Sequence, residues 1–340
     1  MKIGIICPSE IAIRRFMPAL QKCKDLIFAG VGVFSKEECY GGESISGDAF
    51  KTILAKEREK AKVFVEQYGG RIFDSYLEVI SSSDIDAVYF PLPPALHYKW
   101  AKLAIEHGKH VFVEKPLTTS LDDTIDLINE AKKRNLAVHE NYMYAFHSQL
   151  DAIDAIITSK ELGDVRLFRI DFGFPMREAN DFRYNKNLGG GSLIDAGGYT
   201  IHYATRLLGE SAKLICAHLS YNNNFDVDIY GSASLINDDG DVAQISFGMD
   251  NSYKCDLEVW GSKGRLTTGR VLTAPDGFVP NAIIYKANES NQIMLPADDS
   301  FFKSIQHFVL CINDKNIRER RYKSILKQAK LVDEFIKMAK

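Results

Sequence analysis

The first 140 residues alternate between short apolar runs and stretches in which polar and apolar positions recur at helical spacing. Continuous apolar runs are typical of strands that are buried on both faces of a sheet. The pattern predicts strands at residues 2–7, 26–33, 86–90, 110–114 and 136–140, and helices at 12–22, 55–70, 97–108 and 120–135. This alternation predicts a parallel sheet with helices on both faces, which binds ligands at the carboxyl ends of its strands.

The pattern changes after about Tyr142, where strand-like runs follow one another with few helices between them. Strands are predicted at residues 165–174, 213–221, 227–236, 241–249, 254–261 and 265–269, and helices at 300–312 and 322–340. Residues 37–55 are rich in Gly, Ser and charged side chains, which predicts a surface insertion. We therefore predict an α/β chain with a nucleotide-binding domain at 1–142 and an α+β domain at 143–340 that has an open, mostly antiparallel sheet.

The charge balance limits the partners of this chain. With 42 Lys and Arg against 45 Asp and Glu, the net charge is −3, which disfavours nucleic-acid binding. The apolar run before Pro8 is too short for a signal peptide or a membrane span, so we expect a cytoplasmic protein without a membrane partner. Neither the six cysteines nor the eight histidines show metal-ligand spacing, so no metal is predicted.

The turn after the first strand is where a dinucleotide fold carries G-x-G-x-x-G/A. Residues 7–12 read C-P-S-E-I-A, so both leading glycines are replaced and only Ala12 fits the third position. Ser9, Glu10 and Ile11 are the candidate pyrophosphate contacts, because a small N-cap and free N–H groups at a helix start suit a phosphate. Pro8 supplies no N–H. The alternative is an ordinary strand-to-helix turn.

Cofactor preference is set at the end of the second strand, where an acidic residue favours NAD and a basic residue favours NADP. Ser35 and Lys36 follow that strand and can hold a 2′-phosphate through a hydroxyl and a charge. Glu37 and Glu38 come next, so the prediction is a preference for NADP(H) over NAD(H) rather than a strict choice.

Two stretches carry the candidate catalytic groups. Lys115 follows the strand at 110–114 and would lie where a nicotinamide binds. A helix from about Ser192 would place Asp195, Tyr199 and His202 on one face. Gly197 and Gly198 lie inside that helix, each at a cost of about 1 kcal/mol relative to Ala. Either a ligand or tight packing of the helix on a sheet would explain them.

These residues suit hydride transfer to a carbonyl, which needs a proton for the developing alkoxide. Tyr199 can supply the proton if Lys115, from the other domain, lowers its pKa, and Asp195 can orient the substrate or the tyrosine. The alternatives are a lysine that points into water and a helix whose Asp and Tyr serve only packing.

The combination of E-K-P at 114–116 with G-G-G-S-L-I-D-A-G-G-Y at 189–199 resembles the Gfo/Idh/MocA oxidoreductases along nearly the whole chain. The resemblance implies an N-terminal Rossmann domain, a bound nicotinamide cofactor, a catalytic role for Lys115 and an acid/base role for Tyr199, with Asp195 as the motif aspartate. The departure at Cys7-Pro8-Ser9 leaves the pyrophosphate contacts open.

A narrower likeness is to sugar 3-ketoreductases that act on nucleotide-linked deoxysugars and use NADPH. It rests on P-L-P-P-A-L-H at 91–97, F-H-S-Q at 146–149, D-F-R-Y at 181–184 and V-W-G-S-K-G-R-L at 259–266. It implies that the cofactor cleft is lined by Pro91, Leu92, Pro93 and His97, beside Glu114 and Lys115. We expect the substrate to be faced by Tyr142, His147, Arg183, Tyr184 and His202. His147 as a packed histidine and Arg183 as a surface arginine are the alternatives.

The expected function is therefore an NAD(P)-dependent oxidoreductase acting on a sugar or keto-sugar, possibly nucleotide-linked. One alternative is an NAD-dependent dehydrogenase of free polyols or sugars. Another is a catalytically silent binding or regulatory protein, which the missing glycines favour and the trio Lys115, Asp195 and Tyr199 disfavours. Family likeness also implies a homo-oligomer, a dimer or tetramer, that associates through the open sheet.

Overall fold

The structure is a computed structural model that describes residues 1–39 and 46–339. The chain forms two compact units, and each is described by itself. The first comprises Met1–Thr118, Asp122–Asn141 and Ser304–Ile325, and the second comprises Thr119–Leu121, Tyr142–Lys303 and Leu326–Lys340. Residues 304–325, assigned by sequence to the C-terminal domain, lie in the first unit. Arg318 there donates to Asn135 Oδ1, and the hydroxyl of Tyr322 donates to the carbonyl of Leu136.

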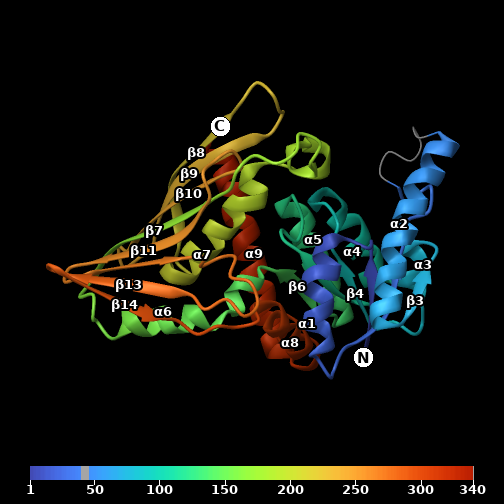
Figure 1. The fold of residues 1–340 in the computed structure, drawn as a ribbon, viewed down its shortest axis with the longest axis horizontal. Coiled ribbons are helices and arrows are strands. Elements are labelled where there is room, and N and C mark those ends of the chain that lie inside the picture. Colours follow the sequence, from blue (N-terminus) through green and yellow to red (C-terminus); the bar gives the residue numbers. More distant parts are fainter. Residues whose placement is uncertain (40–45, 340) are drawn as a thin grey trace. The chain divides into compact units, whose positions relative to one another are not determined.

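The first unit is built on a six-stranded parallel sheet in the order β3-β2-β1-β4-β5-β6 (Figure 1). The strands are β1 (Lys2–Ile6), β2 (Ile27–Gly32), β3 (Arg71–Phe73), β4 (Ala87–Phe90), β5 (His110–Glu114) and β6 (Val138–Asn141). The order reverses between β1 and β4, which is where a dinucleotide binds in a Rossmann fold. The predicted α/β class and parallel sheet are confirmed, and only the short β3 was not predicted.

Two of the predicted helices of the first unit differ from their expected form. The helix expected at 12–22 begins with a π turn at Ala12–Phe16 and continues as α1 (Met17–Gln21). Pro18 lacks the N–H that an uninterrupted α-helix would need, which accounts for the wider turn. Helix α2 (Gly47–Tyr68) starts earlier than expected, because Ser46 caps it by accepting from Ala49 N. The predicted insertion is therefore wrong from residue 47 onward, and its residues 40–45 lie outside the described residues.

The remaining helical elements of the chain were predicted only in part, because the helices at 76–81 and 148–158 and the 3-10 turns were not expected and the last helix begins at 315 rather than 322. They are α3 (Tyr76–Ser81), a 3-10 turn at Pro94–Leu96, α4 (His97–Glu106), α5 (Leu121–Arg134), a 3-10 turn at Met143–Phe146, α6 (Ser148–Thr158), α7 (Gly198–Leu208), α8 (Ser300–Asn313) and α9 (Lys315–Met338). No helix within the described residues combines the length and the apolar character that crossing a membrane requires.

The second unit is built on an eight-stranded sheet in the order β14-β13-β12-β11-β7-β10-β9-β8. Its strands are β7 (Val165–Gly173), β8 (Lys213–Tyr221), β9 (Asp228–Ile236), β10 (Val242–Gly248), β11 (Lys254–Gly261), β12 (Arg265–Gly269), β13 (Asn281–Lys286) and β14 (Glu289–Met294). Only the β7–β10 pair is parallel, so the predicted mostly antiparallel sheet is confirmed. β13 and β14 were not predicted.

The two faces of this sheet differ sharply. Apolar residues of β7, β9, β10 and β11 pack on one face against helices α6, α7 and α9, which run along the sheet in Figure 1. Phe247 of β10 and Phe335 of α9 lie 5.6 Å apart between ring centroids in this core. The opposite face carries polar residues such as Arg169, Asp256 and Glu258, so the sheet alternates as a one-sided antiparallel sheet does.

Candidate active site

The turn after β1 keeps the backbone shape that the missing glycines would supply. Cys7 takes φ +74°, the left-handed region that usually requires glycine, and its N–H donates to Gly32 O at 3.1 Å. Ser9 caps the following helix, with its Oγ accepting from Ala12 N at 3.2 Å. Within the described residues, the N–H groups of Glu10 and Ile11 form no hydrogen bond. These residues fit a pyrophosphate at a helix N-terminus.

The carboxylates after β2 accept hydrogen bonds from groups of the protein. Glu38 accepts from three backbone N–H groups: Ser35 at 2.8 Å, Tyr76 at 2.8 Å and Leu77 at 2.9 Å. Glu38 therefore caps the start of α3, where a negative charge is favoured. Glu37, which is fully exposed, accepts from Ser35 Oγ at 2.9 Å. Both carboxylates are therefore engaged by groups of the protein itself.

His97 ties together the loops that follow β4 and β5. Its buried ring lies between two backbone carbonyls, with Nδ1 at 2.8 Å from Pro116 O and Nε2 at 2.8 Å from Leu92 O. Burial lowers the pKa of His97 to about 4, against the raising effect of the two carbonyls. The neutral ring donates to one of these carbonyls, and because both ring nitrogens face backbone carbonyls, His97 positions the Pro91–Pro93 loop rather than offering a polar atom to a cofactor.

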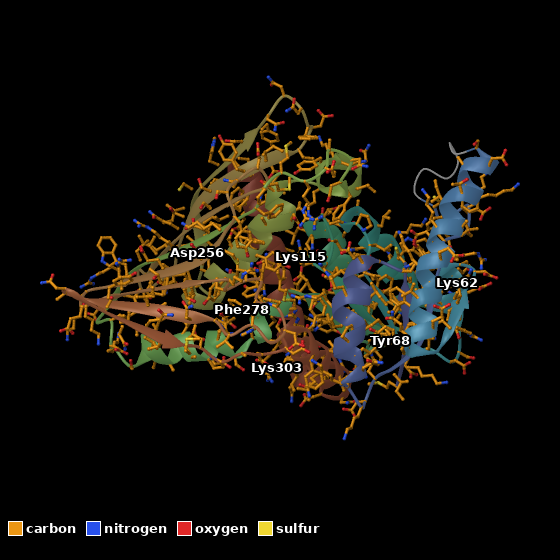
Figure 2. The ribbon with its side chains drawn as sticks, in the orientation of Figure 1. Lys62, Tyr68, Lys115, Asp256, Phe278 and Lys303 are labelled. Atoms are coloured by element: carbon orange, nitrogen blue, oxygen red, sulfur yellow. The ribbon has the colours of Figure 1, made fainter. Side chains whose placement is uncertain are left out.

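Lys115 follows β5 directly and is labelled in Figure 2. The adjacent Glu114 accepts from the Tyr89 hydroxyl at 2.7 Å and from Asn141 Nδ2 at 2.8 Å. Burial raises the pKa of Glu114, and these two donors together with the charge of Lys115 oppose the rise. Glu114 is therefore fixed by the neighbouring strands β4 and β6, which sets the direction in which the chain leaves β5.

Glu140, on β6, is a buried acid that the sequence reasoning missed. Its Oε1 accepts from Leu117 N at 2.8 Å, so it holds the loop that follows Lys115 and Pro116. Burial raises the pKa of Glu140 to about 7, while the Leu117 N–H and the charges of Arg321 and Lys115 work in the other direction. An acidic residue in a strand predicted to be buried was the signal that could have identified it.

In the second unit, two predicted site residues form an ion pair. Arg183 Nε donates to Asp195 Oδ2 at 2.6 Å, and Arg183 Nη1 lies 3.2 Å from Asp181 Oδ1. Burial acts to lower the pKa of Arg183, but the two carboxylates outweigh it and raise the pKa. Arg183 is therefore a partly buried arginine that orients Asp195, and the alternative of a surface arginine is wrong.

Tyr199 packs among aromatic rings at the start of α7. Its ring centroid lies 5.2 Å from Tyr142, 5.7 Å from Tyr144 and 5.4 Å from Phe172. His202 joins the same group, because Tyr142 stacks on it at 4.6 Å and the Tyr144 hydroxyl lies 2.7 Å from its Nδ1. The structure thus brings together the predicted Tyr142, Tyr199 and His202 and adds Tyr144.

The two glycines before Tyr199 serve packing. The helix expected from Ser192 opens with a π turn at Leu193–Gly197, so Asp195 and Tyr199 do not keep the predicted α-helical spacing. A Cβ on Gly197 would lie 2.9 Å from the Phe247 ring, and one on Gly198 would lie 2.4 Å from the Tyr142 hydroxyl. Gln328 of α9 also contacts this turn, because its Nε2 donates to Gly198 O at 2.9 Å. No sequence signal pointed to Gln328, since it lies 130 residues away along the chain.

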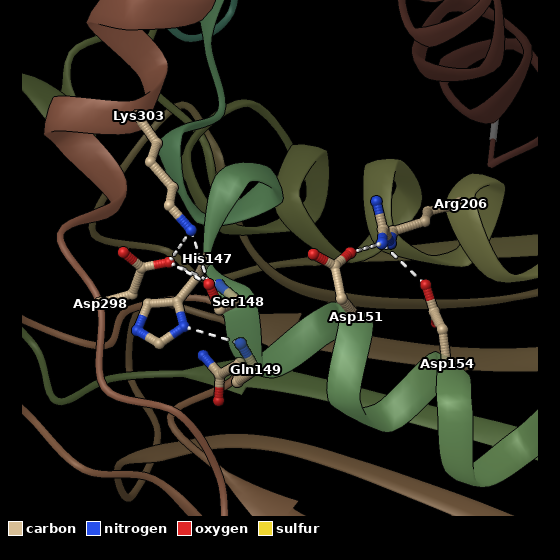
Figure 3. Close-up of polar contacts among 8 residues, drawn as sticks. All are labelled: His147, Ser148, Gln149, Asp151, Asp154, Arg206, Asp298 and Lys303. Carbon is tan, nitrogen blue, oxygen red and sulfur yellow. Dashed lines mark hydrogen bonds and ion pairs between the residues drawn. The ribbon is translucent and has the colours of Figure 1, made fainter.

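Two predicted substrate residues are engaged in local structure. His147 Nδ1 accepts from Gln149 N at 3.1 Å and caps α6, beside the cluster of Ser148, Asp298 and Lys303 shown in Figure 3. The Tyr184 hydroxyl accepts from Arg177 N at 2.9 Å and lies 3.3 Å from Met249 O. Both side chains are buried, and His147 Nε2 has no hydrogen-bond partner within the described residues.

His139, His307 and Cys311 bring their potential ligand atoms within 4.8 Å of one another in the first unit. Burial lowers the pKa of His139 and His307, and the charge of Arg321 lowers both further. Burial also raises the pKa of Cys311 to about 11. A protonated thiol beside an arginine disfavours a cation, so we assign no metal to this cluster.

Comparison with known proteins agrees with this architecture. Residues 25–142 match the family model described as an oxidoreductase family with an NAD-binding Rossmann fold, and residues 150–267 match the GFO/IDH/MocA C-terminal domain. The dTDP-3,4-didehydro-2,6-dideoxy-α-D-glucose 3-reductases of Actinomadura kijaniata and Streptomyces violaceoruber are each 33% identical, over 98% of this chain and 94% of theirs.

The solved structures give the same result. A 3-ketoreductase from Actinomadura kijaniata, crystallised with NADP and TDP-benzene, has a TM-score of 0.89 and 32% identity, covering 99% of this chain and 97% of its own. An aldose-aldose oxidoreductase from Caulobacter crescentus, at 22% identity and a TM-score of 0.83, shares the fold. The chain belongs to the GFO/IDH/MocA family of oxidoreductases with an NAD-binding Rossmann fold.

Proposed function

We propose that this enzyme reduces the keto group of a nucleotide-linked deoxysugar and prefers NADP(H). The observation that carries the proposal is Tyr199, a phenol held by Tyr142, Tyr144 and Phe172 at the start of α7. Asp195 lies four residues before Tyr199, and its ion pair with Arg183 fixes the adjoining π turn. The full-length likeness to 3-reductases of dTDP-linked sugars, and to a ketoreductase that binds NADP, supports the substrate class and the cofactor.

The first unit supplies residues that suit the cofactor. Ser9, Glu10 and Ile11 would hold the pyrophosphate, Ser35 and Lys36 the 2′-phosphate, and the loop at residues 91–93 would line the nicotinamide end. A bound nicotinamide supplies the hydride to the carbonyl carbon. Glu38 already accepts from three N–H groups, which supports a role as a helix cap rather than as a ligand of the ribose hydroxyls.

The protein's own groups manage the proton. As the carbonyl carbon is reduced, its oxygen gains charge and takes the phenolic proton of Tyr199. Lys115, the lysine of the E-K-P motif, is proposed as a second catalytic group, since a positive charge can stabilise the negative charge that develops in the reaction. Asp195, held by Arg183, orients a hydroxyl of the sugar. The reaction consumes one NADPH and one proton for each ketone reduced to an alcohol.

The test is an assay of NADPH oxidation with a dTDP-linked 3-keto-deoxysugar, set against NADH and against free aldoses. We expect turnover with the linked substrate and NADPH. Lys36→Ala should weaken NADPH binding about three- to tenfold and leave NADH binding unchanged, as expected for one exposed charge on a phosphate. Tighter binding of NADH than of NADPH to the unmodified enzyme would reject the preference.

Oxidation of a free sugar is the second candidate. It is favoured by the NADP-dependent D-xylose 1-dehydrogenase of Haloferax volcanii, which is 30% identical over 78% of this chain and 75% of its own. If NADPH forms with free xylose or a polyol faster than the keto-sugar is reduced, oxidation of a free sugar is the better assignment.

Oligomer formation and a cytoplasmic location complete the proposal. The open face of the second unit's sheet carries the exposed Trp260. Nearby, Glu258 forms ion pairs with Arg169 at 3.3 Å and with Arg265 at 3.5 Å. A face of this kind suits association of copies through the sheet. Light scattering on the purified chain should give a dimer or tetramer mass, and a monomer would reject this part.

A further inference from the structure

Strand β6 of the first unit reads V-H-E-N, and its three polar residues are all buried. Side chains alternate between the two faces of a strand, so His139 and Asn141 share one face and Glu140 lies on the other. Both residues of the shared face contact Ser304 of α8, whose Oγ donates to Asn141 Oδ1 at 2.8 Å and lies 2.9 Å from His139 Nε2. A buried imidazole is unfavourable unless it is hydrogen-bonded, so this contact stabilises the histidine at its position.

The hydrogen bonds continue from Asn141 to the carboxylate next to Lys115. Asn141 Nδ2 donates to Glu114 Oε1 at 2.8 Å, across the parallel pair of β5 and β6. The same oxygen accepts from the hydroxyl of Tyr89 at 2.7 Å. The charge and the backbone N–H of Lys115 also lower the pKa of Glu114, against the effect of burial. A continuous chain of hydrogen bonds thus runs from His139 to the residue that precedes Lys115.

Every donor in this chain points in the same direction. Ser304 has a single hydroxyl proton, which it donates to Asn141, so it accepts from the N–H at His139 Nε2. The amide of Asn141 is then fixed with its oxygen toward Ser304 and its NH2 group toward Glu114. Hydrogen bonds that are aligned in series strengthen one another. The chain therefore strengthens the bond from Asn141 to the carboxylate of Glu114 and favours its ionised form.

The ring of His139 is held in the orientation that the chain requires. It stacks on Phe112, its neighbour on β5, with centroids 4.7 Å apart and planes inclined by 26°. Phe308 of α8 lies 5.9 Å from the same ring. Burial lowers the pKa of His139, and the charges of Arg321 and His307 lower it further. The imidazole is therefore neutral, and the one proton that it carries is on Nε2.

We propose that His139 is a positioning residue for the reaction. Through the hydrogen-bond chain it holds Glu114 as an aligned carboxylate, and it thereby fixes the backbone that presents Lys115. A small misplacement of a catalytic group slows the chemical step without weakening the binding of the cofactor. The inference rests on the proposed function, since it needs Lys115 to take part in the reaction. A histidine that served packing alone would need its ring but not its Nε2 proton.

Two substitutions separate the donor from the ring. His139→Phe keeps an aromatic ring against Phe112 and removes the donor, whereas His139→Gln keeps an N–H donor and removes the ring. With a dTDP-linked keto-sugar and NADPH, His139→Phe should lower kcat about three- to tenfold, as expected for one lost hydrogen bond, and leave both KM values unchanged. His139→Gln should keep kcat within about twofold of the unmodified enzyme. His307→Phe is the matched control and should keep full kcat, since its ring lies 5.7 Å from His139 and its Nδ1 contacts Cys311 Sγ at 3.5 Å.

Ser304→Ala breaks the chain at its middle and leaves the histidine ring in place. It should lower kcat by about the same factor as His139→Phe. The double variant should lose no more than either single variant, because both substitutions interrupt one chain and their effects are then not additive. Losses that multiply in the double variant would show that the two residues act independently, and this would overturn the chain.

The outcomes separate this inference from the proposed function. If the unmodified enzyme reduces the keto-sugar and His139→Phe keeps full kcat, the role of His139 is wrong and the proposed function stands. If His139→Gln loses as much kcat as His139→Phe, the donor does not matter and the inference is overturned. If the unmodified enzyme does not reduce the keto-sugar, the proposed function is rejected and the role of His139 falls with it. Thermal unfolding and NADPH binding, measured on each variant, confirm that it is folded.

Discussion

Arg183 Nε and Asp195 Oδ2 lie 2.6 Å apart, with only 21% and 13% of the two side chains exposed. The pair joins the loop before the glycine-rich motif to the π turn that precedes Tyr199. A charge-assisted hydrogen bond of this length, shielded from water, couples the position of the loop to that of the π turn before α7.

Asp195→Asn should remove the charge and keep the shape of that contact. We expect the free energy of unfolding to fall by about 2 kcal/mol, because a hydrogen bond to a charged group is lost while Arg183 stays partly buried. Urea unfolding measures it. Asp181→Asn is the control, with a loss of about 1 kcal/mol, since its contacts to Arg183 are longer and Asn caps as well as Asp. Equal losses in the two variants would mean that Asp195 is not the main partner.

Tyr199→Phe should lower kcat by roughly two to four orders of magnitude and leave NADPH affinity unchanged, because only the proton donor is removed. Steady-state kinetics with a linked keto-sugar and fluorescence titration of NADPH measure the two quantities. Tyr144→Phe removes a hydroxyl that lies 2.7 Å from His202 Nδ1 and should change kcat far less. Full activity of Tyr199→Phe would show that Tyr199 is not the proton donor.

Glu140→Gln should change how stability depends on pH. The pKa of Glu140 rises from 4.5 to about 7 on folding, so the folded state holds a proton that the unfolded state has lost. Stability from this group is fully present below about pH 4.5 and is lost as pH rises through 7, on the order of 3 kcal/mol in total. Glu140→Gln keeps the acceptor for Leu117 N and removes the titration. We expect the variant to be more stable than the unmodified chain at pH 8, with little difference at pH 4.5.

Denaturant unfolding across this pH range compares the two proteins. Glu130→Gln, on α5, is the comparison with the opposite sign, because hydrogen bonds from Arg134 and Lys133 lower the pKa of Glu130 despite its partial burial. A parallel pH dependence in Glu140→Gln and the unmodified chain would show that Glu140 is charged in the folded state and that its pKa is not raised.

Gly198→Ala should destabilise the protein and disturb Tyr199. The added Cβ would lie 2.4 Å from the Tyr142 hydroxyl, and Tyr142 makes an edge contact with Tyr199. Overpacking of this kind costs about 1–3 kcal/mol, so we expect a lower melting temperature and reduced kcat. Gly47→Ala, where a Cβ meets nothing within 4 Å, is the control and should be neutral or slightly stabilising. An unchanged melting temperature in Gly198→Ala would show that Tyr142 can move.

Much of the fold follows from local pattern alone. The strands at Lys2–Ile6, Ala87–Phe90 and His110–Glu114 are buried on both faces, so each is a continuous apolar run that can be read without knowing its neighbours. Lys115 follows from the same reasoning, since the end of such a strand is where ligands bind. By contrast, β14 reads E-S-N-Q-I-M, with almost no apolar residue, and forms because β13 supplies its hydrogen bonds.

The sequence by itself determined the parallel and antiparallel halves, the family motifs and the residue types suited to hydride transfer, because hydrophobic periodicity and strand ends are local properties. Only the tertiary structure decided which of two readings held for Gly197 and Gly198, and that Glu38 is used as a helix cap. It alone revealed Glu140, Tyr144 and Gln328 near the predicted residues. Burial and contacts between distant segments set a side chain's pKa and its partners, and neither is encoded in the spacing of residues along the chain.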